Sequence, residues 1–380
     1  MRDPRIDRLG RLIAEYSLEL GEGDVLRIDG TELASHHMLA LMRAALARGA
    51  HPYTNVTPNG LDELLVAEGS DEQLRFVSPI QWNEIERVDA VVRFWSDANT
   101  RAFTRADPER HALHLSTRRD VSRRLLERAA AGEARWCGTL VPTHAFAQDA
   151  GMSLSEFEDF VYGALHCADG EDPVVYWRRR ERELQEVAGG LAEVRELRIT
   201  GPDTDLTVGG EGRRGRTASG RRNLPDGEVF TSPLETRTEG TIRFAVPSIH
   251  QGVEVEDVRL RFEDGRVVEF DAARGRDHLA AMLDTDDGAR VLGEVAFGLN
   301  YEIDRFTRNI LFDEKIGGTM HLALGAGFKQ AGGGNSSALH WDMICDLREG
   351  GEVYADGELV WRSGAFLAEP SELAVAGAGG

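Results

Sequence analysis

Lysine and cysteine are nearly absent from this sequence of 380 residues. The three cysteines, Cys137, Cys167 and Cys345, are scattered and form no Cys-x-x-Cys pair. Such usage argues against a disulfide framework and against a cysteine zinc site, and it is typical of a reducing cytoplasm. We therefore expect a cytoplasmic protein whose stability comes from a sizeable hydrophobic core.

Positive charge is also scarce. The chain has 44 lysines and arginines against 65 aspartates and glutamates, a formal net charge of −21. Nucleic acid is not an expected partner, because no cationic surplus is available to neutralise phosphates. No apolar run approaches the ~18–20 residues of a membrane span, and the first residues, MRDPRIDRLGRLIAEY, lack the apolar core of a signal peptide. We expect no membrane partner.

Residues 1–190 alternate predicted helices with predicted strands. Apolar spacing predicts helices over residues 4–20, 32–50, 61–79, 105–132, 153–166 and 176–191, and buried strands over 24–30, 51–58, 88–99 and 134–143. This β–α–β order is typical of a parallel sheet with right-handed crossovers. The sequence therefore predicts an N-terminal α/β domain over 1–190, ending near Gly189-Gly190. No glycine-rich phosphate-binding motif follows any of these strands.

The pattern changes to mostly β-structure after residue 190. Strands are predicted over residues 196–212, 241–246, 252–272 and 351–361. Asp264-Gly265 and Asp356-Gly357 predict hairpin turns within them. A helix over 277–298 is expected to interrupt the strands. We expect the C-terminal tail ELAVAGAGG to be weakly ordered at best. We predict a mainly β (α+β) C-terminal domain over 191–370.

Potential metal ligands concentrate between Glu314 and Asp342. His321 follows Glu314 by seven positions, and His340 and Asp342 are two apart. On a strand, residues two apart point to the same face, so the imidazole and the carboxylate would converge while Trp341 turns away. Imidazole with carboxylate suits zinc, cobalt or manganese. Taken singly, each of these residues could equally be a solvated acid or a half-buried histidine.

Four segments of the chain resemble one known family. They are NLPDGEVFTSP (223–233), LGEVAFG (292–298), RNILFDEKIGGTMHLALGAGF (308–328) and NSSALHWDM (335–343). These segments are similar to the thermophilic-type metalloaminopeptidases of peptidase family M29, the aminopeptidase T, aminopeptidase S and aminopeptidase II group. The resemblance spans roughly residues 1–365. It implies a homodimeric enzyme that removes N-terminal residues from short peptides through a dinuclear metal centre.

The same resemblance implies a set of metal ligands. Two divalent ions, zinc, cobalt, manganese or magnesium, would be held by Glu228, Glu294, Glu314, His321, His340 and Asp342. Glu294 and Glu314 are expected to be catalytic, with Glu294 bridging the ions. Glu228 follows the turn Pro225-Asp226-Gly227. Glu294 is expected on a helix among apolar neighbours, where a buried carboxylate requires a cationic partner.

One position departs from the family pattern. Seven residues after the expected ligand His321, the family usually carries a tyrosine that is thought to assist catalysis, and this chain has Phe328. If that hydroxyl stabilises the oxyanion, its loss would lower the rate roughly 10²–10³-fold. Lys315 and Lys329 are candidate replacements, although Lys315 is equally interpretable as a solvated charge.

Two other functions remain open from the sequence. Ring-cleaving dihydroxypyridine dioxygenases resemble this family and use one iron held by two histidines and an aspartate, a role that His321, His340 and Asp342 could fill. Three further carboxylates argue against this alternative, since a single iron does not need them. A non-catalytic metal-binding protein is disfavoured, because no ligand of the motif is missing.

Overall fold

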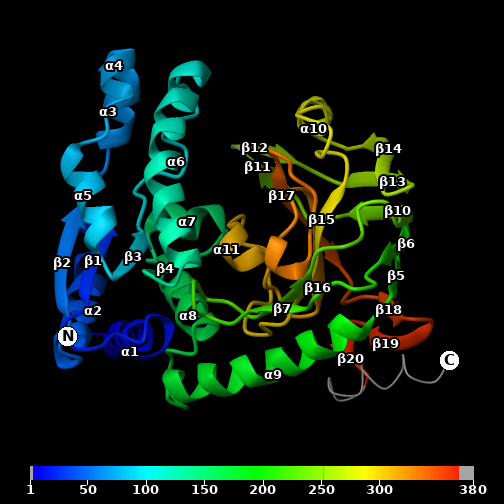
Figure 1. Ribbon diagram of the computed structural model, residues 1–380, viewed down its shortest axis with the longest axis horizontal. Helices are drawn as coiled ribbons and strands as arrows, with labels where there is room; N and C mark the ends of the chain where they lie inside the picture. Colours follow the sequence, from blue (N-terminus) through cyan, green and yellow to red (C-terminus); the bar gives the residue numbers. More distant parts are fainter. Residues whose placement is uncertain (1–2, 251, 368–380) are drawn as a thin grey trace. The chain divides into compact units, whose positions relative to one another are not determined.

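The computed structural model describes residues 3–250 and 252–367, and the chain divides into two compact units (Figure 1). Unit 1 comprises Met1–Trp177 and Gly220–Pro225, and unit 2 comprises Arg178–Ser219 and Asp226–Gly380. The predicted boundary after residue 190 lies inside helix α9 (Pro173–Glu193) and stays a prediction. The C-terminal tail ELAVAGAGG lies outside the described residues.

Unit 1 is built on a five-stranded parallel sheet of order β2-β1-β3-β4-β8. The strands are β1 (Val25–Gly30), β2 (His51–Val56), β3 (Ala90–Trp95), β4 (Arg135–Leu140) and β8 (Asn223–Leu224). Every neighbouring pair runs parallel. The α/β prediction for the first half of the chain is confirmed.

The helices predicted in unit 1 are present with one exception, and the helices over residues 79–87 and 144–149 were not predicted. The helices of unit 1 are α1 (Pro4–Leu12), α2 (Ser35–Ala47), α3 (Leu61–Glu68), α4 (Asp71–Leu74), α5 (Pro79–Arg87), α6 (Pro108–Ala130), α7 (His144–Asp149) and α8 (Leu154–Ala164), with a π-helical turn at Ile13–Ser17 and a 3-10 turn at Glu32–Ala34. The helix expected over 61–79 is broken, because the Ser70 side chain caps a new helix by accepting a hydrogen bond from Gln73 N.

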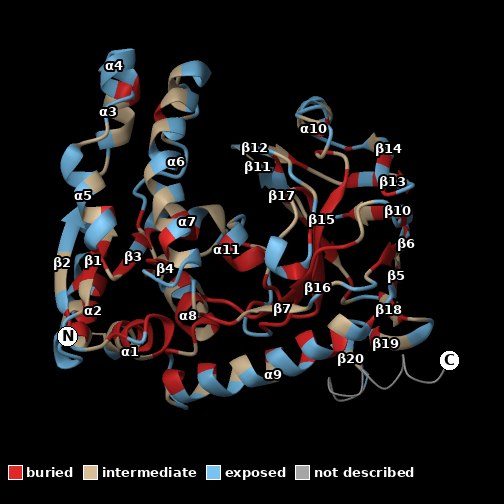
Figure 2. Ribbon diagram, in the orientation of Figure 1, coloured by how far each residue is buried: buried red, intermediate tan, exposed pale blue. Residues whose placement is uncertain are grey.

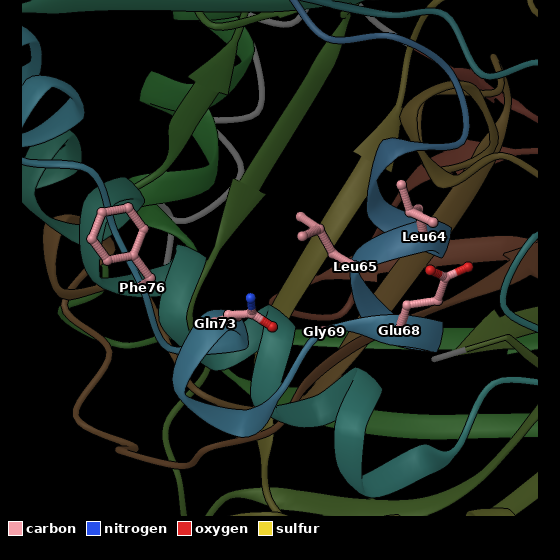
Figure 3. A pocket seen from close by; sticks show the side chains of 6 residues that line it. All are labelled: Leu64, Leu65, Glu68, Gly69, Gln73 and Phe76. Atoms are coloured by element: carbon pink, nitrogen blue, oxygen red, sulfur yellow. The ribbon is translucent and has the colours of Figure 1, made fainter.

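A hollow of about 400 Å³ lies along α3 and α4 of unit 1 (Figure 3). Its lining residues are Leu64, Leu65, Glu68, Gly69, Gln73 and Phe76. It contains one carboxylate and no histidine, so it lacks the side chains that would bind a catalytic metal. No helix among the described residues is long and apolar enough to cross a membrane.

Unit 2 contains an eight-stranded antiparallel sheet of order β14-β13-β10-β6-β5-β18-β19-β20. Its strands are β5 (Glu196–Gly201), β6 (Thr204–Gly209), β10 (Thr238–Phe244), β13 (Val258–Glu263), β14 (Arg266–Asp271), β18 (Glu352–Ala355), β19 (Glu358–Arg362) and β20 (Ala365–Phe366). Both predicted Asp-Gly hairpin turns are present. Asp264 and Gly265 have φ of 49° and 81°, and Asp356 and Gly357 have φ of 50° and 89°.

A second, five-stranded antiparallel sheet of unit 2 has the order β17-β16-β15-β9-β7. Its strands are β7 (Arg216–Ala218), β9 (Glu228–Thr231), β15 (Leu292–Gly298), β16 (Thr319–Gly325) and β17 (His340–Asp346), and a hairpin of β11 (Ser248–His250) and β12 (Val253–Val255) adds two short strands. Figure 2 shows how deeply the middle strands are buried, and all seven residues of both β15 and β16 are inaccessible. The helices here are α10 (Arg276–Leu283), α11 (Ile310–Asp313) and a 3-10 turn at Lys329–Ala331.

The helix predicted over 277–298 is wrong in its second half. Helix α10 ends at Leu283, and residues 292–298 form strand β15, which places Glu294 on a strand. Strand β15 pairs with β16 on one side and β9 on the other and is buried on both faces. A strand buried on both faces shows no alternation, so its apolar run cannot be told from a buried helix by periodicity.

Candidate metal centre

The five-stranded sheet of unit 2 brings most of the candidate ligands to one face. Glu294 of β15 pairs with Ala323 of β16, and Ala323 pairs with Asp342 of β17. His321 and His340 each lie two residues before a member of this row, so they share its face. Ala323 has only a methyl group, which leaves space between the two carboxylates.

The opposite face of the same strands belongs to the hydrophobic core. It carries Val295, Phe297, Leu322, Leu324, Trp341 and Met343. The prediction that His340 and Asp342 share a face while Trp341 turns away is therefore confirmed. Trp341 is 2% exposed, and its Nε1–H donates to Ser248 Oγ over 2.7 Å.

A β-bulge at Gly293 sets the direction of Glu294. The register between β15 and β16 shifts between Leu292 and Glu294, which makes Gly293 the extra residue. A Cβ at position 293 would lie 2.1 Å from the carbonyl oxygen of Ala326, so only glycine fits there. Bulges re-aim side chains next to functional sites. This one directs Glu294 to the same face as Asp342.

The side-chain atoms of the candidate ligands lie within a few ångströms of each other. His340 Nε2 is 3.3 Å from Glu294 Oε2 and 3.4 Å from Asp342 Oδ1. His321 Nε2 is 3.8 Å from Glu294 Oε1 and 3.7 Å from Glu228 Oε2. The cluster therefore has two histidine nitrogens, each facing two carboxylates.

Two groups of three possible ligands have all their ligand atoms within 4.8 Å of one another. The first group is Glu294, His340 and Asp342, and the second is Glu314, His321 and Asp342. Glu228 belongs to neither group but lies against His321, as described above. The structure thus brings all six predicted residues together, while their assignment as ligands stays a prediction.

The histidines are oriented as metal-binding histidines are. The Nδ1 atom of His321 lies 2.9 Å from the backbone oxygen of Glu314, and the Nδ1 atom of His340 lies 2.9 Å from that of Ala326. A hydrogen bond from Nδ1 to a carbonyl leaves Nε2, the atom that faces the carboxylates, as the coordinating nitrogen. Asp342 Oδ1 is buried and has no hydrogen-bond partner among the described residues. These donors fit a divalent metal ion.

Charges inside the cluster strongly perturb the pKa values of its members. Burial opposes the charged form of His340, but the adjacent carboxylates of Asp342 and Glu294 outweigh it and raise its pKa to about 11. Burial likewise opposes charge on His321, yet Glu294 and Glu228 raise its pKa to about 9. Both imidazoles are therefore cationic at neutral pH without metal, so a bound ion has to displace their protons.

Glu314 is presented by a short, well-anchored turn. It directly follows α11, and the preceding Asp313 carboxylate accepts hydrogen bonds from Thr307 N over 2.7 Å and from Thr307 Oγ1 over 2.8 Å. Asp313 is 2% exposed. Because this buried carboxylate holds the turn, the position of Glu314 relative to His321 is set by the backbone.

Two members of the cluster were not among the predicted ligands, although Lys315 was named as a candidate hydrogen-bond donor. Lys315 is 1% exposed, so its interpretation as a solvated charge is wrong. Its Nζ lies 3.1 Å from Glu228 Oε2 and 3.7 Å from Asp226 Oδ1, and it also contacts Glu314 Oε1. The only sequence signal for this position was that both lysines of the chain fall between Glu314 and Asp342. Asp226, which is 2% exposed, had been interpreted only as part of a turn.

Phe328 lies at the edge of this cluster. Its ring centroid is 5.1 Å from that of His340 and 5.0 Å from that of Phe230. Its backbone N–H donates to Ser232 Oγ over 2.8 Å. The position at which the resembling family usually has a tyrosine is thus in contact with a candidate metal ligand.

Comparison with protein families identifies one match over nearly the whole chain. The model described as thermophilic metalloprotease (M29) matches residues 2–366. Aminopeptidase T of Thermus aquaticus is 36% identical over 57% of this chain, although the aligned part is only 60% of that relative. Aminopeptidase 2 of Geobacillus stearothermophilus is 27% identical over 97% of this chain and 98% of its own length.

Two solved structures share the fold. The wild-type AmpT of Thermus thermophilus superposes with a TM-score of 0.83 at 24% identity, covering 96% of this chain and 99% of that chain. The 2,5-dihydroxypyridine dioxygenase of Pseudomonas putida KT2440 has a TM-score of 0.58 at 16% identity, covering 96% of this chain and 98% of that chain. At these identities both similarities establish the architecture alone.

Proposed function

The chain belongs to the thermophilic metalloprotease family M29, and from this membership we propose that it is a metal-dependent aminopeptidase that removes N-terminal residues from short peptides. One observation carries the proposal, the convergence of Glu228, Glu294, Glu314, His321, His340 and Asp342 in unit 2. The relatives named aminopeptidase T and aminopeptidase 2 support the same activity.

We propose that the cluster holds two divalent ions, with zinc, cobalt, manganese and magnesium as the candidates. Glu294, His340 and Asp342 would hold one ion, and Glu314, His321 and Asp342 the other. The two oxygens of Glu294 face different histidines, which supports Glu294 as a bridging ligand together with Asp342. Divalent ions bound here supply a Lewis acid and activate a water at neutral pH.

The side chains of this chain attract and orient the substrate. The acidic cluster suits the cationic α-amine of a peptide, since buried carboxylates attract it more strongly than exposed ones do. Glu294 and Glu314 are the proposed catalytic residues, because each lies in a group that could hold an ion and each can accept a proton. Glu228 is held against Lys315 and His321.

A ring-cleaving dioxygenase is the weaker alternative. It would need His321, His340 and Asp342 to bind one iron together. Among the described residues, the two groups of possible ligands instead place the two histidines in separate sets, each completed by a glutamate. The shared fold does not favour the alternative, because one architecture serves unrelated reactions.

The test is metal stoichiometry on the purified protein, followed by release of free amino acids from a panel of dipeptides with added zinc, cobalt or manganese. We expect about two ions per chain, by the two-group geometry, and cleavage of unblocked dipeptides only. N-acetylated dipeptides are the matched control, because they lack the cationic amine. A single iron per chain with no cleavage would replace this proposal by the dioxygenase.

Phe328→Tyr tests the departure from the family. The new hydroxyl would lie beside His340, where it can donate a hydrogen bond to a developing oxyanion. We expect kcat to rise by up to about 10²-fold, while metal stoichiometry stays unchanged. Phe230→Tyr, on the neighbouring ring, is the control. An unchanged kcat for the Phe328 variant would mean that another donor already stabilises the oxyanion.

We further propose a cytoplasmic homodimer. Unit 1 exposes several large apolar side chains, including Leu46, Phe76 and Ile80 with exposures of 61%, 69% and 70%, and burying such side chains stabilises an interface. Light scattering coupled to gel filtration at micromolar concentration measures the mass directly. A mass equal to the 41.9 kDa chain would contradict the dimer.

A further inference from the structure

Lys315 is the one lysine that the described part of the chain buries, and its ammonium lies among three carboxylates. Its contacts are Glu228 Oε2 at 3.1 Å, Asp226 Oδ1 at 3.7 Å and Glu314 Oε1. The other lysine, Lys329, is exposed on its 3-10 turn. A lysine with 1% exposure therefore sits inside the proposed metal centre.

The positive charge of Lys315 compensates the buried carboxylates around it. A buried ammonium is costly unless carboxylates surround it, and a buried carboxylate has the same need. Burial raises the pKa of Glu228 above its ordinary value, and Lys315 opposes that rise. The carboxylates in turn raise the pKa of Lys315 well above its ordinary value although burial lowers it. Lys315 thus holds a buried ammonium in ion pairs with Glu228 and Glu314.

The contacts of Lys315 are distributed unequally over the two groups of possible ligands. It pairs with Glu314, which belongs to the group with His321, and with Glu228, which also lies 3.7 Å from His321 Nε2. No ion pair joins it to Glu294 in the part of the chain that the structure describes. One half of the cluster therefore contains the lysine ammonium in addition to its histidine, and the other half does not.

We propose that Lys315 is a fixed counter-cation that makes the two metal positions unequal in affinity. The position formed by Glu294, His340 and Asp342 fills first. The position formed by Glu314, His321 and Asp342 fills at higher metal concentration, because an ion there has to share Glu314 with the ammonium and is repelled by it. Lys315 is a positioning residue, since it acts through Glu228 and Glu314. The inference rests on the dinuclear centre proposed above.

The test is calorimetric titration of the chelator-treated protein with Zn²⁺, which needs no activity measurement. The wild-type protein is expected to bind two ions in two separated steps. Lys315→Met removes the charge and keeps an unbranched side chain of similar length. We expect the second dissociation constant to fall by at least about tenfold, which corresponds to 1.4 kcal/mol, while the first stays within about twofold.

Two control variants test whether the effect is due to the charge of Lys315. Lys329→Met, at the exposed lysine, should leave both steps unchanged. Lys315→Arg keeps the positive charge and should preserve the separation of the steps. If Lys315→Met does not fold, the titrations of the wild-type protein and of Lys315→Arg still test the inference. Equal affinities of the two metal positions in either protein would overturn it.

The outcomes also separate the inference from the proposed function. Binding of no metal, or of one iron, would remove the dinuclear centre itself. Binding of two ions with equal affinity would keep the aminopeptidase proposal and reject the role of Lys315. A second affinity that weakens in Lys315→Met would show that the lysine only maintains the structure.

Discussion

The two units of the chain bury different kinds of charge. Among Asp, Glu, His, Lys and Arg, the side chains of unit 1 with less than a tenth of their surface exposed are all nitrogen bases, namely Arg27, His37, His114 and Arg128. In unit 2 they are mainly carboxylates, namely Asp226, Glu228, Glu294, Asp313, Lys315 and His321. Within the described residues, unit 1 buries no carboxylate to this extent.

The partners of these buried groups differ in the same way. Arg128 of unit 1 donates to the backbone oxygens of Ile85 and Val88 over 2.5 and 2.9 Å, and His37 Nε2 lies 2.8 Å from the Tyr162 hydroxyl. Arg27, His114 and Arg128 also lie beside the carboxylates of Asp29, Asp62 and Glu133, so the buried bases of unit 1 have partners within the protein. In unit 2, carboxylates face one another, and Asp342 Oδ1 has no hydrogen-bond partner among the described residues. When neighbouring residues do not fully neutralise a buried charge, a bound ligand is indicated.

The largest effect that would sharpen this comparison is expected from Asp342→Asn. Asp342 belongs to both groups of possible ligands, so the variant should lose metal from both positions. Even changing an outer partner of a metal ligand costs about 10–100-fold, so we expect aminopeptidase activity to fall by more than about 10²-fold. Asp346→Asn, on the same strand but paired with Arg348, is the matched control. Equal losses in both variants would contradict a special role for Asp342.

Metal removal should destabilise unit 2 and leave unit 1 unchanged. Metal at a free concentration of about 100 times its Kd stabilises the folded state by about 2.7 kcal/mol. Hydrogen exchange measured by mass spectrometry before and after chelation resolves the two units. We expect faster exchange in β9, β15, β16 and β17 and constant exchange in β1 and β3. Equally faster exchange in both units would contradict the claim that the metal stabilises unit 2 alone.

A pair of glycine substitutions tests the same contrast in the backbone. Gly293→Ala places a methyl group against the Ala326 carbonyl and should lower the free energy of unfolding by about 1–3 kcal/mol. Gly163→Ala lies within helix α8 of unit 1, where a Cβ meets nothing within 4 Å, and should raise it by about 0.5–1 kcal/mol. Urea denaturation measures both. A tolerated Gly293→Ala would show that the bulge does not need glycine.

The smallest effect is the contribution of His37, in unit 1, to the pH dependence of stability. Burial, with the charge of His36 adding to it, lowers the pKa of His37 to about 4 from its ordinary 6.5. The folded state therefore binds fewer protons than the unfolded state. The contribution of neutral His37 to the free energy of unfolding is fully present above pH 6.5 and is lost as the pH falls towards 4. At pH 5.5 the loss is about 1 kcal/mol.

His37→Gln should flatten this pH dependence, which urea denaturation at pH 7.5 and pH 5.5 measures. His51→Gln is the control, because the His51 side chain is exposed and does not contribute to the pKa shift of His37. An unchanged slope in the His37 variant would mean that another group titrates in this range.

Much of the fold follows from local patterns in the sequence. The alternation of helices and strands in unit 1 and the two Asp-Gly turns depend on neighbouring residues, and both are found in the structure. The side on which His340, Trp341 and Asp342 project depends only on the two-residue period of a strand. These features can be predicted from the sequence because the residues that determine them are neighbours along the chain.

The sequence by itself determined which side chains are available as ligands, since two histidines and several carboxylates stand in a chain with almost no lysine or cysteine. Only the tertiary structure decided that Glu294 lies on a strand and that Lys315 is buried against Glu228. Both outcomes depend on pairing between segments distant along the chain, and the free energy of burial comes from such partners.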